Sequence, residues 1–76
     1  MSWYVIDYTL WPTVDSDTHE RHTDRSTHES DTRVGAINAV LYYVRGRKSD
    51  YEMARINEVI GPFETEQEAR DVQYES

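Results

Sequence analysis

The sequence predicts an α+β fold: a small sheet of two to three strands with one main helix packed on it and a short C-terminal helix, in ββαβα order. Three observations support this fold class. Residues 3–11 alternate apolar side chains as a half-buried strand does. Residues 34–44 repeat apolar side chains at helical spacing. Residues 65–68 form a capping box, which is typical of the start of a helix.

The first strand is predicted from Trp3 to Trp11, because aromatic and β-branched residues dominate this stretch. Pro12 then ends the ladder, since it has no N–H to donate. The opposite face of the strand carries both tryptophans. The face expected to point to the core consists of Tyr4, Ile6, Tyr8 and Leu10.

Residues 15–33 form a polar segment without a single aliphatic or aromatic side chain. Such a segment cannot bury enough apolar surface to offset its own ordering entropy. Two interpretations are open: a mobile loop, or an edge strand from about His19 to Thr27 paired with the first strand. The edge strand is favoured, because charged side chains protect an edge from aggregation and long irregular loops are uncommon in compact domains.

The main helix is predicted to begin after Asp31 or Thr32 as the N-cap and to run to about Arg45. Gly46 is expected just past its end, in the left-handed conformation that often terminates helices. Arg45, Arg47 and Lys48 would complement the helix dipole there. The expected inward stripe consists of Val34, Ile37, Val40, Leu41 and Val44.

Residues 51–60 fit both a strand and a helix. A capping box at residues 49–52 and the spacing of Met53, Ile56 and Ile60 favour a helix. Ala54, Ile56 and Ile60 also fit one face of a strand, with Glu58 as an exception. We predict a strand from Glu52 to Ile60, because it ends in β-branched residues.

The Gly61-Pro62 pair then predicts a turn into the last helix. Thr65 begins the capping box there, and Ala69 and Val72 give this helix a short inward face.

The length of 76 residues predicts a single domain, 1–76, and the absence of Cys excludes disulfides. The formal net charge of −7 disfavours direct binding to nucleic acid and favours basic protein partners. Solubility alone, or a halophilic source, would also account for this acidity. No targeting signal and no long apolar run is visible, so we expect a cytoplasmic protein without a membrane segment.

The polar segment contains three histidines, which are weak metal-ligand candidates because their spacing matches no established site: His19, His22 and His28. On a strand, His22 and His28 would share a face. Nucleophile motifs, the phosphate loop and the dinucleotide fingerprint are absent from the sequence. We therefore predict a protein that is not an enzyme and needs no cofactor.

Two sets of side chains are candidates for contact with a partner. The aromatic residues Trp3, Trp11, Tyr42 and Tyr43 could anchor an interface or simply close the core. The acidic set consists of Asp15, Asp17, Glu20, Asp24, Glu29 and Asp31. Three interleaved arginines reduce the formal charge of that segment to −3, from six acidic and three basic residues.

These features predict a small acidic protein-binding module. One hypothesis is a phage-type inhibitor that blocks a basic surface of a nucleic-acid-processing complex, of the anti-CRISPR or anti-restriction class. The alternative is a structural or accessory domain that forms a homodimer through its edge strand. A deep, closed cleft lined by the histidines would contradict both.

Overall fold

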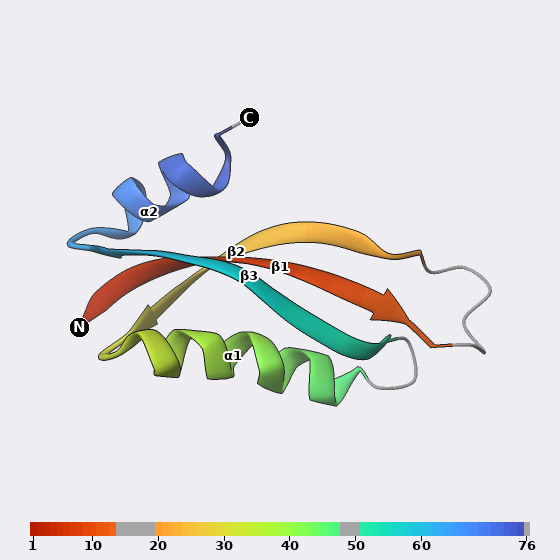
Figure 1. Cartoon of the computed structure of the whole chain (residues 1–76). Helices are drawn as coiled ribbons and strands as arrows, with labels where there is room; N and C mark the ends of the chain where they lie inside the picture. The colour runs from red at the N-terminus through yellow and green to blue at the C-terminus, as the bar shows by residue number, and fades with distance from the viewer. Residues whose placement is uncertain (14–19, 48–50, 76) are drawn as a thin grey trace.

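The computed structural model describes residues 1–13, 20–47 and 51–75. They form a three-stranded antiparallel sheet, in the order β2-β1-β3, with one helix on each face (Figure 1). The predicted α+β class and ββαβα order are confirmed. The elements are β1 (Ser2–Pro12), β2 (His22–Ser30), α1 (Arg33–Gly46), β3 (Tyr51–Phe63) and α2 (Glu66–Gln73).

The core lies between α1 and the face of the sheet that α1 covers, and most of the sheet's buried side chains come from β1. Because side chains alternate along a strand, the predicted inward residues of β1 all point to this face and are buried. The core cluster consists of Tyr4, Ile6, Tyr8, Leu10, Ala36, Val40, Val44 and Tyr51.

The polar segment does supply an edge strand. β2 pairs with β1 at nine consecutive positions, from Ser2 opposite Ser30 to Leu10 opposite His22. The strand begins and ends three residues later than predicted, at His22 and Ser30 instead of about His19 and Thr27, because its pairing extends to Ser2 at the start of β1. His19 lies outside the described residues.

Helix α1 begins where the sequence predicts, with Thr32 as its N-cap. The Gly35 amide donates to Thr32 Oγ1 at 2.9 Å. Gly46 is the last helical residue and does not have a positive φ, so the predicted left-handed cap there is wrong. Arg47 is the C-cap residue instead, and its amide donates to the Val44 carbonyl.

The inward face of α1 also differs from the predicted stripe. It is centred on Ala36, Val40 and Val44, while Val34 and Leu41 are 64% and 41% exposed. Successive side chains of a helix point about 100° apart around its axis. Leu41 therefore lies at the edge of the buried face, and Val34 lies beyond it. Several large apolar side chains therefore remain on the outside of this helix.

Residues 51–60 belong to a strand rather than a helix, but β3 does not end at Ile60. It continues through Gly61 and Pro62 to Phe63, which pairs with Trp3. The predicted turn at Gly61-Pro62 is therefore wrong. An irregularity after Ile56 shifts the alternation, so that Ile60 pairs with Val5 and faces away from α1.

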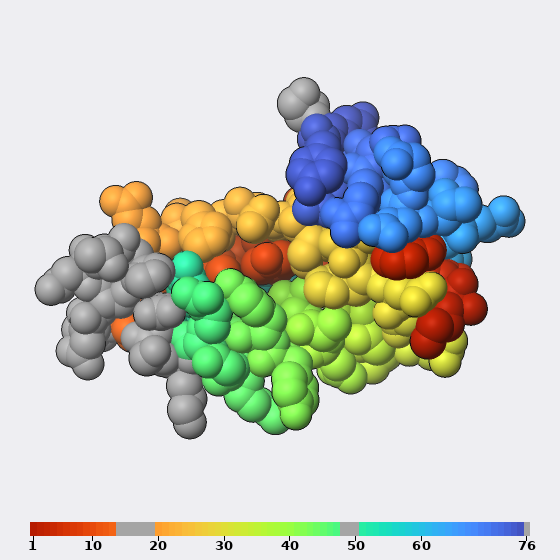
Figure 2. All heavy atoms as spheres, turned by 180° about the vertical axis from the view of Figure 1, so that it is seen from behind, coloured from red at the N-terminus to blue at the C-terminus, as the bar shows by residue number. Residues whose placement is uncertain are grey.

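Helix α2 covers part of the opposite face, as Figure 1 shows. The predicted capping box is confirmed, since the Glu68 amide donates to Thr65 Oγ1 at 3.2 Å. Ala69 and Val5 are both fully buried on this side. Seen from behind in Figure 2, α2 stands over one end of the sheet and leaves the start of β2 clear. Neither helix of the described chain has the length and apolar character needed to cross a membrane.

Candidate functional site

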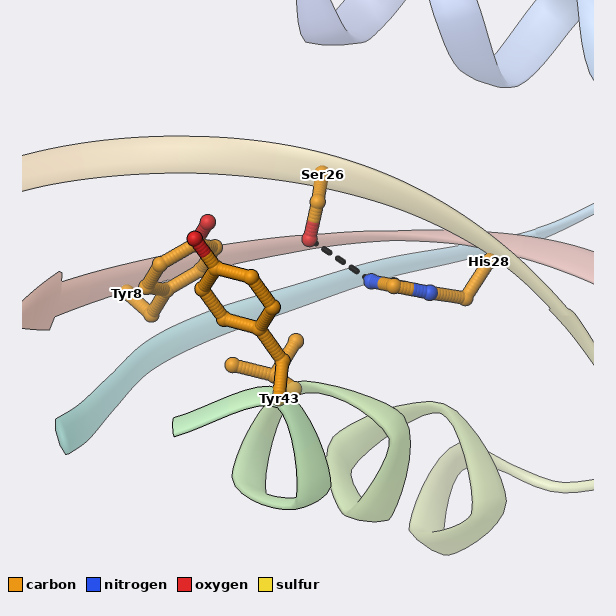
Figure 3. Close-up of a pocket in the computed structure, with 5 residues that line it drawn as sticks. Tyr8, Ser26, His28 and Tyr43 are labelled. Atoms are coloured by element: carbon orange, nitrogen blue, oxygen red, sulfur yellow. Dashed lines mark hydrogen bonds between the residues drawn. The ribbon is translucent and has the colours of Figure 1, made fainter. Parts of the chain in front are cut away.

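A pocket of about 180 Å³ lies between α1 and the edge of the sheet (Figure 3). It is half-open to solvent. β1 contributes Tyr8, β2 contributes Ser26 and His28, and α1 contributes Val40 and Tyr43. Its walls are mainly apolar, as is usual for binding pockets.

The register of the sheet explains why two polar residues of β2 reach this pocket. Ser26 pairs with Ile6 and His28 pairs with Tyr4, and both partners face α1. Side chains directly opposite in adjacent strands point to the same face. The small Ser26 side chain leaves space beneath α1 that a branched aliphatic residue would fill.

One end of the pocket is polar. Ser26 Oγ lies 2.7 Å from His28 Nε2, within hydrogen-bond distance. The Tyr8 hydroxyl also interacts with Ser26. In Figure 3 the hydroxyl ends of Tyr8 and Tyr43 lie together beside this pair. An entering molecule would therefore meet aromatic and aliphatic walls and a small group of hydroxyls.

Burial sets the protonation state of this polar end. Burial lowers the pKa of His28 below its usual value, which favours the neutral imidazole. Burial, reinforced by the negative charge of Asp24, raises the pKa of the Tyr8 phenol. Both groups are therefore neutral hydrogen-bonding partners near pH 7.

The Ser26–His28 pair has the distance of an activated serine nucleophile, but catalysis requires more than that distance. A third group normally orients the imidazole, and preorganised donors stabilise the oxyanion. Among the described residues, no carboxylate forms a hydrogen bond with the His28 ring. The described residues therefore supply a serine and an imidazole at this distance, without a carboxylate bonded to the imidazole.

Helix α1 carries two consecutive exposed tyrosines, of which Tyr43 lines the pocket. The Arg45 guanidinium lies 5.9 Å from the centre of the Tyr42 ring, and that of Arg47 lies 5.6 Å from the Tyr43 ring. Such cation–π contacts restrict both partners. The tyrosines that the sequence marked as partner contacts thus lie outside the core, although Tyr43 also lines the pocket.

The other predicted aromatic contacts, Trp3 and Trp11, lie far apart near the two ends of β1. Both side chains point to the α2 side of the sheet and are partly buried. Arg21 covers the Trp11 ring at 5.8 Å. The two tryptophans therefore do not form one surface.

The structure does not gather the acidic candidates on one face. Asp24 pairs with Tyr8 and Glu29 pairs with Trp3, so they point to opposite sides of β2. Both are exposed, as are Glu20 and Asp31. Asp15 and Asp17 lie outside the described residues.

The two described histidines share the α1 face, as predicted, but have different neighbours. The His22 ring packs edge-on against Tyr51, with ring centres 5.8 Å apart, whereas His28 contacts Ser26. No cluster of three metal-ligating side chains occurs among the residues that the structure describes.

Sequence reasoning missed the pocket and also a polar network on the opposite face of the sheet. Arg25 donates to Asp7 Oδ2 at 3.1 Å and to the carbonyl oxygen of Val72 at 2.9 Å. Gln73 Nε2 donates to the Arg25 carbonyl at 3.1 Å. These bonds attach α2 to the sheet. The alternation of Ser26 and His28 on a strand was the signal that could have indicated the pocket.

Comparisons with protein-family models, with curated proteins and with solved structures gave no match to this chain.

Proposed function

We propose that this protein is a protein-binding module that docks through the outward surface of α1 beside the pocket. The observation that carries the proposal is the exposure of large apolar side chains on this one helix. Exposed apolar side chains gathered on one element are a feature of interaction sites. The helix exposes Val34, Leu41, Tyr42 and Tyr43.

The centre of this surface is the flank that carries the two tyrosines. Because successive helical residues point about 100° apart, Leu41 and Tyr43 cannot face the same flat partner. Tyr43 lines the pocket, and Tyr42 precedes it in the chain and is 75% exposed. Tyrosine and arginine are both enriched at interface hot spots, which supports this flank as the contact.

Charge indicates what the partner offers. The whole chain has a formal net charge of −7, yet residues 33–47 contain three arginines and no carboxylate. The arginines are Arg33, Arg45 and Arg47. Since opposite charges on facing surfaces favour encounter and fix register, the expected partner surface has an apolar centre with carboxylates around it.

A second candidate function is to block a basic surface of a nucleic-acid-processing complex, as a phage-type inhibitor would. It is supported by the charge around α2, where residues 64–75 contain five carboxylates and one arginine, a formal charge of −4. This side of the molecule is distant from the α1 surface in Figure 1, so the two functions predict different contact residues.

The test is capture of a partner from the native host by the full chain, followed by a binding titration of the purified pair. Tyr42→Ser is expected to weaken binding at least about fivefold, because truncating a central interface aromatic typically costs more than about 1 kcal/mol. Tyr74→Ser is the matched control, because Tyr74 is 71% exposed and Tyr42 75% exposed.

Equal binding by both tyrosine variants would contradict the proposal. Loss of binding in Glu68→Gln together with Asp71→Asn, but not in Tyr42→Ser, would favour the basic-surface inhibitor instead. A constitutive homodimer in sedimentation, disrupted by substitutions on the β2 edge, would favour the accessory-domain alternative.

A further inference from the structure

We infer that the pocket between α1 and β2 receives the phenol ring of a tyrosine side chain from the partner, and this assignment rests on the proposed protein-binding function. Three properties of the pocket lead to it: its volume, its apolar walls and its cluster of hydrogen-bonding groups at one end. Each restricts the class of group that can enter.

The volume restricts the guest to a single ring. The pocket measures about 180 Å³. Sites for drug-sized molecules are typically about 300–1,000 Å³, whereas an apolar cavity of about 150 Å³ is large enough to bind benzene. A single six-membered ring therefore fits, and the pocket is smaller than the sites that hold drug-sized molecules.

The walls favour an aromatic guest. Val40 forms an aliphatic wall, and the rings of Tyr8 and Tyr43 provide aromatic surfaces. Aromatic rings stack edge-to-face or offset on one another and gain energy beyond area burial. Among the described residues, no Asp, Glu, Lys or Arg lines the pocket. A charged guest would therefore lose its hydration without a counter-charge.

The polar end favours a ring that carries a hydroxyl. Ser26 Oγ and His28 Nε2 are 2.7 Å apart, and the Tyr8 hydroxyl interacts with the same serine. A phenol hydroxyl can both donate and accept, so it can join this group without leaving any member unsatisfied. A phenylalanine ring has no hydroxyl and would not form this additional hydrogen bond.

The position of the pocket favours a partner's side chain over a free phenol. Tyr43 belongs both to the pocket wall and to the proposed docking surface, so a protein seated on α1 would cover the opening. Anchor side chains that fill small pockets at the centre of an interface supply much of its binding energy.

The first experiment titrates the full ¹⁵N-labelled chain with p-cresol, the tyrosine side-chain analogue, and with toluene, the phenylalanine analogue. We expect saturable amide shifts at Ser26, His28 and Tyr43, with p-cresol binding roughly two- to tenfold tighter than toluene, as one additional hydrogen bond would give. Non-saturable shifts up to the solubility limit, or shifts elsewhere, would overturn the inference.

Two variants of β2 test the location. Ser26→Ile fills the space beneath α1 and is expected to weaken p-cresol binding at least tenfold. Thr23→Ile makes the same kind of change on the same strand but on the opposite face, so it should leave binding unchanged. Equal binding by the two variants would overturn the inference.

If Ser26→Ile does not fold, Ser26→Ala keeps the space and removes the hydroxyl. The preference for p-cresol over toluene should then disappear while toluene still binds. A preference that persists in Ser26→Ala would overturn the role of the polar end.

The same variants separate the inference from the proposed function. Weaker partner binding in both Ser26→Ile and Tyr42→Ser supports both. If Tyr42→Ser weakens partner binding and Ser26→Ile does not, the docking surface stands and the tyrosine anchor is overturned. If p-cresol binds and neither variant affects the partner, the ring comes from a free phenol, and the assignment to a partner side chain is wrong.

Discussion

Gly61 offers the sharpest test of how β1 and β3 fit together. Its φ is +130°, in a region that side-chain-bearing residues rarely adopt. A Cβ at this position would lie 2.9 Å from the Trp3 carbonyl oxygen and 3.1 Å from the Tyr4 ring. The carbonyl belongs to the paired backbone, so it cannot move aside without disturbing the sheet.

Gly61→Ala should therefore destabilise the protein by about 3 kcal/mol, since unfavourable backbone conformations alone cost about 1–3 kcal/mol and the steric contact adds to this. A chain of this size has a total stability of about 4–11 kcal/mol. For a small protein whose urea m-value is about 1 kcal/mol/M, the midpoint should fall by about 3 M.

Gly46→Ala is the matched control. A Cβ at Gly46 would meet no atom of the described residues within 4 Å, and the residue is helical. This substitution should leave stability unchanged or raise it by up to about 1 kcal/mol. Urea unfolding followed by tryptophan fluorescence measures both. If Gly61→Ala unfolds at the wild-type midpoint, the backbone conformation at Gly61 does not constrain the fold and the reasoning is refuted.

Three further predictions concern single contacts. Arg25→Met should lower the free energy of unfolding by about 1–2 kcal/mol and increase amide hydrogen exchange in α2, because the bond to the Val72 carbonyl is lost at a partly buried site. Unchanged exchange would contradict this. Because burial lowers the pKa of His28, the unfolded state binds more protons than the folded state. The stability that His28 contributes should therefore be fully present above about pH 6.5, its unfolded pKa, and be lost as the pH falls through its lower folded pKa. His28→Gln should flatten that decline in urea titrations, and an identical pH profile would refute the assignment. Thr32→Ala should cost about 1 kcal/mol in thermal unfolding, since the Gly35 amide loses its cap; no change would show that water replaces it fully.

The fold class could be predicted because strong local signals agreed with one another. The alternation along β1 placed Tyr4, Ile6, Tyr8 and Leu10 in the core, and the structure buries all of them. The caps at Thr32 and Thr65 located both helix starts. Each signal depends on a few adjacent residues and on a simple backbone rule, so no tertiary information was needed.

The errors arose where the phase of a pattern depends on tertiary contacts. In α1, Val34 and Leu41 fit a helical stripe as well as Ala36 and Val40 do, and the small size of Ala36 concealed its place against the sheet. In β3, the irregular pairing near Glu58 reverses the alternation. Glu58 did not fit the predicted face, and that misfit was the available sign of the bulge.

Sequence reasoning missed the pocket because the pocket depends on what β2 lacks. A strand without apolar side chains is ordered here by its neighbours. Tyr4 and Tyr8 of β1 pair with it and lie on the α1 face of the sheet. On the α2 face, Thr27 bonds to Gln73. Since Ser26 provides little volume where it faces α1, the core stays incomplete at that point. An apolar residue there would close the core and add stability through burial. The polar composition of β2 therefore leaves this space open beside the exposed Tyr43, where we propose that the partner docks.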